Sequence, residues 1–131
     1  MLQQSSGYRN RAGWKASNGI VSLTILEGGG YLAELRRADQ DCPNLLWEPP
    51  WPTMDPHDFD PSVHEAAYGG GSEARLLATI AGHNLCLPFW GDPSAAEYAA
   101  GASFHGEAGQ VRWRLDSSRQ DDLNISALLP G

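Results

Sequence analysis

Residues 18–37 have the sequence NGIVSLTILEGGGYLAELRR, and this stretch decides the fold class. It opens with Asn18-Gly19, a dipeptide typical of tight turns, and continues over 20–26 with a run rich in β-branched residues. Three glycines at 28–30 interrupt the run, and an extended pattern resumes over 31–37. The stretch therefore predicts two strands joined as a hairpin or a tight β corner. A phosphate-binding loop is disfavoured, because neither Lys-Ser/Thr nor a helical pattern follows the glycines.

The rest of the chain predicts short elements. Residues 39–71 are rich in Pro, Trp and Asp and predict a long loop, since the prolines exclude regular helix or central strand. This loop is either a lid over the core or an aromatic wall beside a ligand site. Helical spacing predicts a short helix over 72–81, with Ser72 as its N-cap, and one helical turn over 95–100. Strands are predicted over the ranges 103–107, 111–115 and 123–128, with a polar turn over 116–122.

Composition limits the class of protein. A chain of 131 residues fits one domain, and 41% apolar with 19% charged residues is typical of a globular protein. The net charge of −7 argues against a nucleic-acid partner. Residues 1–10 hold no apolar run, so we expect no signal peptide or membrane anchor, a cytoplasmic protein, and a flexible or edge segment over 1–17. The isolated Cys42 and Cys86 predict two buried thiols without a disulfide.

The segment with the strongest candidate ligand-binding side chains is FHGE at 104–107. On an extended strand His105 and Glu107 point to the same face, where they could grip a hydroxyl-bearing ligand or a metal. A metal is disfavoured, because cupin-type barrels place a second His where this chain has Glu107. A structural His beside a surface Glu is the alternative, and no cofactor is expected. The second polar pair, His83-Asn84, suits either polyol recognition or an ordinary loop. No local motif indicates nucleophilic catalysis.

Several of these segments together resemble the N-terminal half of galactose mutarotase (aldose 1-epimerase)-like proteins, over about 18–128. The matching pieces are ILEGGGY at 25–31, NLLWEPPW at 44–51, AGHNLC at 81–86, and FHGEA at 104–108 followed by Trp113. Their order and spacing carry the resemblance more than any one piece. Authentic mutarotases tend to have a second Gly where Glu107 stands, so the chain is most similar to an uncharacterised mutarotase-like branch.

The resemblance implies a mainly β fold, a partial antiparallel β-sandwich of the supersandwich type, formed by residues 1–131 as a single domain. In that family an open cleft on one sheet binds a pyranose, and His105 matches the His that contacts the sugar. The implied ligand is therefore a monosaccharide or another carbohydrate. The candidate sugar contacts are His105, Glu107, His83, Asn84, Trp47 and Trp51.

The family's general base and acid lie in segments that follow the matched region. We therefore expect a carbohydrate-binding, aldose 1-epimerase-like protein that is incomplete as a catalyst. The alternative is a noncatalytic structural or sugar-binding module that assembles with itself or with a partner chain. A sandwich cut after the strand near 123–128 leaves strand edges unpaired, and the apolar Ile125, Leu128 and Leu129 there favour such association.

Overall fold

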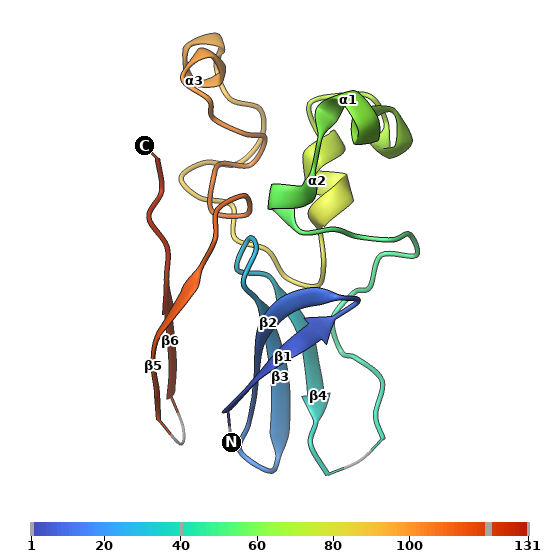
Figure 1. The fold of residues 1–131 in the computed structure, drawn as a ribbon, viewed down its shortest axis with the longest axis vertical. Helices are drawn as coiled ribbons and strands as arrows, with labels where there is room; N and C mark the ends of the chain where they lie inside the picture. Colours follow the sequence, from blue (N-terminus) through green and yellow to red (C-terminus); the bar gives the residue numbers. More distant parts are fainter. Residues whose placement is uncertain (1, 40, 120–121, 131) are drawn as a thin grey trace.

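The computed structural model describes residues 2–39, 41–119 and 122–130, and it contains two antiparallel sheets and five short helices (Figure 1). The first sheet has the order β1 (Leu2–Tyr8), β2 (Arg11–Ser17), β3 (Val21–Leu26), β4 (Leu32–Arg37), and the second pairs β5 (Arg114–Arg119) with β6 (Asp122–Ser126). The helices are η1 (Pro56–Asp58), α1 (Pro61–His64), η2 (Glu65–Tyr68), α2 (Ala74–Thr79) and α3 (Ala95–Ala99). Strand exceeds helix, so the predicted mainly β class is confirmed.

The predicted β3–β4 hairpin is confirmed, and local chemistry explains the turns on either side of β3. Before β3, the Asn18 side-chain oxygen accepts hydrogen bonds from the N–H groups of Ile20 and Val21, at 3.0 and 2.8 Å. After β3, Gly30 has a φ of 62°, and a Cβ atom there would lie 2.6 Å from Nε1 of Trp113. Only glycine suits this corner, because the backbone is left-handed and the Trp113 ring packs directly against it.

Two hydrophobic clusters form the core, and Arg11 connects them. The first cluster contains Tyr8, Leu26, Tyr31, Ala33 and Ala81, and the second contains Phe59, Ala74 and Ala78. Arg11 is 3% exposed and donates hydrogen bonds to the carbonyls of Thr79, at 2.6 Å, and Gly28, at 3.2 Å. Its guanidinium carbon lies 5.2 Å from the Tyr31 ring centroid. Arg11 therefore ties α2 to the first sheet.

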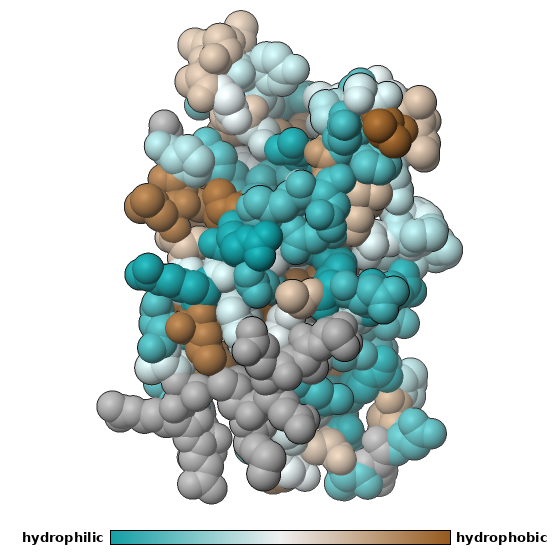
Figure 2. Space-filling model, viewed as in Figure 1, coloured by the Kyte–Doolittle hydropathy of each residue, from teal (hydrophilic) through white to brown (hydrophobic). Residues whose placement is uncertain are grey.

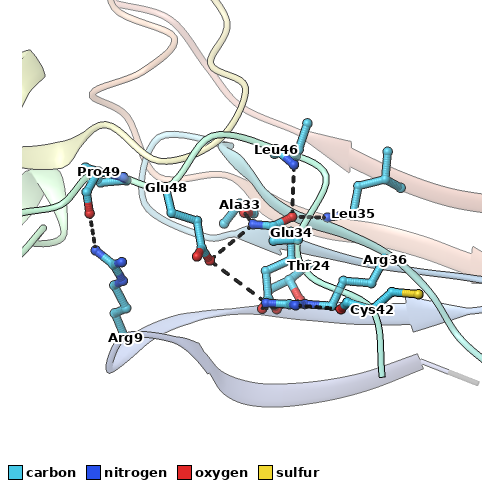
Figure 3. Close-up of polar contacts among 11 residues, drawn as sticks. Arg9, Thr24, Ala33, Glu34, Leu35, Arg36, Cys42, Leu46, Glu48 and Pro49 are labelled. Carbon is cyan, nitrogen blue, oxygen red and sulfur yellow. Dashed lines mark hydrogen bonds and ion pairs between the residues drawn. The ribbon is translucent and has the colours of Figure 1, made fainter. Parts of the chain in front are cut away.

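The segment after β4 turns back and lies along the outer edge of that strand (Figure 3). The Asn44 side chain accepts a hydrogen bond from Leu35 N–H at 3.0 Å and donates one to the Ala33 carbonyl at 2.8 Å. Next to it, Leu45 N–H donates to the Leu35 carbonyl at 2.9 Å. Asn44 thus presents the same donor and acceptor that a neighbouring strand would present.

The predicted long loop is correct for 41–55 and wrong for 56–68, which folds into η1, α1 and η2. Pro56 and Pro61 stand at the first positions of η1 and α1, where the missing N–H costs nothing. The side chains of Asp55 and Asp60 cap these two helices. Proline here starts helices instead of excluding them.

Two other predicted helices are confirmed as α2 and α3. The expected Ser72 cap is wrong, because Glu73 precedes α2 without a side-chain cap bond and Ser72 donates to Asp92 at 3.1 Å. For α3, Ser94 and Glu97 form a capping box that stabilises this single turn.

Two expectations about strands need correction, at 103–107 and at 116–122. Residues 103–107 form a turn, with a φ of 62° at His105 and 80° at Gly106, so no strand exists there. The predicted polar turn is largely strand, since β5 continues to Arg119 and β6 begins at Asp122; residues 120 and 121 lie outside the described part. The segment 1–17, expected to be flexible or at an edge, forms β1 and β2, and β1 is the edge strand.

Candidate functional site

Three neighbouring aromatic rings form what we call the aromatic platform: Trp90, His105 and Phe104. The ring centroids of Trp90 and His105 are 3.9 Å apart with an interplanar angle of 20°, and those of Phe104 and His105 are 4.0 Å apart. Trp90 is 77% exposed. A large aromatic side chain held by stacking and still open to water is available to pack against a ligand.

The backbone fixes His105 in this stack. Its N–H donates to the Gly91 carbonyl at 2.8 Å, and its Nδ1 accepts a hydrogen bond from Gly91 N–H at 2.7 Å. Because Nδ1 accepts, the neutral ring carries its proton on Nε2, which can donate to a ligand. At Gly106 a Cβ atom would collide with the Leu87 carbonyl, so the segments around 87–91 and 104–106 are locked together.

A cleft of about 550 Å³ adjoins the platform at Phe104. It lies between the helices η1 to α2 and the segment around α3, two groups that stand apart at the top of Figure 1. The lining combines aromatic, small and polar side chains from both groups: Phe59, Pro61, Glu65, Gly71, Ser72, Ala74, Arg75, Leu76, Pro93, Tyr98, Gly101, Ala102, Ser103, Phe104 and Gln110. Its size is typical of a site for a small molecule.

Arg75 supplies positive charge in the cleft wall. It belongs to α2, is partly buried, and places its guanidinium carbon 5.4 Å from the Phe59 ring centroid. Glu65 also lines the cleft, but it lies beyond ion-pair distance of Arg75. The cleft therefore offers a guanidinium beside aromatic surface.

Only one member of the predicted His105/Glu107 pair reaches the platform. The expectation that both point to one face is wrong, because the segment is a turn and not a strand. Glu107 is 9% exposed, and its Oε2 is buried without a hydrogen-bond partner among the described residues. One oxygen of the carboxylate therefore lies inside the fold, away from solvent.

The other predicted contacts lie apart from the platform and the cleft. His83 is exposed and pairs through its backbone with Leu32, and the Asn84 amide donates to Sγ of Cys86 at 3.4 Å. Trp47 and Trp51 form a separate edge-on pair, with ring centroids 5.7 Å apart. Trp51 Nε1–H donates to the Leu77 carbonyl at 2.9 Å, which anchors this pair on α2.

The sequence interpretation missed Trp90, Arg75, Tyr98 and Gln110 as candidate site residues. An available signal was Trp90 itself, a large aromatic residue followed by Gly91 in a proline-containing loop. Its link to His105 depends on the paired backbone bonds to Gly91, which no local pattern predicts.

A second polar cluster lies below the cleft and is structural. Asp55 accepts hydrogen bonds from both the backbone N–H and Nδ1 of His57, each at 2.9 Å. Burial would raise the pKa of Asp55, but these bonds and the nearby Arg11 charge outweigh burial and hold the pKa below its ordinary value. The carboxylate caps η1 and therefore stabilises the fold in its ionised form.

Comparisons with protein-family models, with curated proteins and with solved structures found no match for this chain. Within the described residues, no three His, Cys, Asp or Glu side chains gather as metal ligands would. None of the described helices has the length and apolar character needed to cross a bilayer. Cys42 and Cys86 form no disulfide and are partly exposed, so the prediction that these two thiols are buried is wrong.

Proposed function

We propose that this chain binds a carbohydrate at the aromatic platform and the adjoining cleft. The observation that carries the proposal is the exposed Trp90 ring, stacked on His105 beside a cleft of about 550 Å³. A pyranose has a C–H face that packs on an aromatic ring and hydroxyl groups that need donors and acceptors. The Nε2–H of His105 and the Ser103 hydroxyl supply polar groups beside the rings.

We propose that the described residues bind the sugar but do not open its ring. Aldose 1-epimerisation needs an acid and a base held in register around the sugar. Glu107 lies in the interior, and within the described chain His105 makes no ion pair with a carboxylate. Descent from a mutarotase-like sandwich stays part of the proposal, supported by the sequence pieces named above.

The test compares two tryptophan variants in a titration with a panel of neutral monosaccharides, followed by NMR chemical-shift changes. We expect weak binding that Trp90→Ala reduces about five-fold or more, because stacking on the ring contributes about 1 kcal/mol. Trp47→Ala is the matched control, since Trp47 is 52% exposed but lies in the other aromatic pair. Equal effects of the two substitutions, or shifts that cluster away from residues 90–110, would contradict the proposed site.

A second candidate function, assembly with another chain, rests on the β5–β6 hairpin. No further strand pairs with this hairpin among the described residues, and Leu128 just beyond it is 90% exposed. Figure 2 shows hydrophobic side chains gathered over this C-terminal part of the chain. A two-stranded hairpin alone is marginally stable, so a strand or surface from a second chain would stabilise it.

A further inference from the structure

We propose that the ligand of the cleft is a sugar bearing an anionic oxygen group, a carboxylate or a phosphate, which binds the guanidinium of Arg75. The inference rests on the proposed carbohydrate binding and adds the chemical class of the sugar. It starts from Arg75, whose surroundings differ from those of the other arginines that the structure describes.

Arg75 is the exception among the arginines whose side chains are described. Each of the others donates to at least one oxygen atom: Arg9, Arg11, Arg36, Arg37, Arg112 and Arg114. In the described chain the Arg75 guanidinium lies over the Phe59 ring and makes no hydrogen bond or ion pair. The sequence holds 16 acidic against 9 basic residues, so a shortage of acidic partners does not explain this.

Because Arg75 lines the cleft, the N–H donors of its guanidinium are available to a ligand. A guanidinium partly withdrawn from water loses hydration, and it regains that free energy only when oxygens accept its five N–H groups. The side chain lines the cleft, where a ligand carboxylate or phosphate can accept two parallel hydrogen bonds. The Phe59 ring, 5.4 Å from the guanidinium carbon, limits the freedom of the side chain, which reduces the entropy lost when the anion binds.

The rest of the cleft fits the remainder of such a sugar. Tyr98 and Phe104 supply aromatic wall, and Gln110 also lines the cleft, although its amide oxygen is buried. Phe104 also belongs to the aromatic platform, so the anionic group at Arg75 and the sugar ring near Phe104 occupy one continuous site. Among the described residues Glu65 is the only acidic one in the lining, and it opposes the anion without neutralising Arg75.

The experiment measures the affinity for D-glucuronate, D-glucose 6-phosphate and D-glucose at one ionic strength, by titration calorimetry. We expect wild type to prefer the two anionic sugars, and Arg75→Gln to weaken both about ten-fold or more while glucose changes less than about two-fold. Arg75→Lys keeps the positive charge but loses the planar set of N–H donors. Its affinity for the two anionic sugars should therefore lie between those of wild type and Arg75→Gln. Glu65→Gln should strengthen binding of the anionic sugars only. The preference between the two anionic sugars shows whether carboxylate or phosphate is the better group.

The outcomes separate the two proposals. Equal affinity for glucose and glucuronate, unchanged by Arg75→Gln, would overturn the anionic class and leave carbohydrate binding intact. Loss of glucuronate affinity in Arg75→Gln but not in Trp90→Ala would support the anion site and overturn the platform. Absence of binding by all three sugars would overturn both. Thermal melting of each variant, with Arg75→Lys as the milder change, confirms that the fold is retained.

Discussion

Replacing Arg11 with Met should destabilise the fold strongly, although Met retains most of the side chain's length. The substitution removes the charged donor from the Thr79 and Gly28 carbonyls, at 2.6 and 3.2 Å, and leaves both buried acceptors without it. Hydrogen bonds from a charged group contribute about 1.5–3 kcal/mol each, so two of them amount to about 3–6 kcal/mol. Part of this is offset, because burial of the guanidinium is itself unfavourable, as the lowered pKa of Arg11 indicates. We expect a net loss of about 3–4 kcal/mol.

Such a loss is a large fraction of the free energy of unfolding, which for a domain is about 5–15 kcal/mol. The measurement is urea denaturation followed by tryptophan fluorescence, with the free energy taken from the linear fit. Arg112→Met is the matched control, because Arg112 bonds Glu27 at 2.7 Å but its side chain is 56% exposed. Exposed pairs contribute less than about 1 kcal/mol. An Arg11→Met variant no less stable than Arg112→Met would refute the role given to Arg11.

Three further predictions concern stability and assembly. Glu107→Met should raise the free energy of unfolding by about 1 kcal/mol, because it removes a buried carboxyl oxygen that has no hydrogen-bond partner among the described residues; a lower urea midpoint would contradict this. The free energy of unfolding should decline as the pH falls below about 4. Burial would raise the pKa of Glu34, but hydrogen bonds from Thr24 and Arg36 outweigh burial and lower it. The pKa of Asp55 is lowered in the same way. Both groups stabilise the fold above their unfolded pKa and lose that contribution as pH falls through the folded pKa, so Glu34→Gln should flatten a thermal-melting curve against pH. Light scattering at micromolar concentration should show a mass above that of one chain, and Leu128→Glu should lower it; a concentration-independent monomer would refute hairpin-mediated assembly.

The sequence predicts those parts of the fold that are determined by neighbouring residues. The side chain of Asn18 forms the turn at Asn18-Gly19, and the β-branched run after it forms β3. In contrast, the pattern at 104–107 suggests a strand, and the backbone is left-handed there because His105 binds Gly91, fourteen positions earlier. The β1–β2 pair was missed for the same kind of reason. Its Gly13 reads as a weak strand residue, yet a side chain there would collide with the Ile25 carbonyl across the sheet.

The candidate site, too, could be predicted from the sequence only in part. His105 could be selected from the sequence because its segment matches a sugar-contacting motif. Trp90 and Arg75 could not, since one becomes relevant through a stack with His105 and the other through its lack of an oxygen partner within the described chain. Both properties depend on tertiary structure, so the spacing of residues along the chain does not predict them.

The Asn44 amide, which stands in for a strand along β4, also determines how copies of this chain can join. With that edge closed by Asn44 and Leu45, the strand edges left open in the described part are those of β1 and of the β5–β6 hairpin. Pairing of like edges, β1 with β1 or hairpin with hairpin, obeys two-fold symmetry and closes as a dimer. Pairing of a hairpin with the β1 edge of the next copy is head-to-tail, and it continues into a ring or an open filament. Closure of the β4 edge by Asn44 and Leu45 therefore leaves β1 and the hairpin, within the described part, as the edges through which copies could pair.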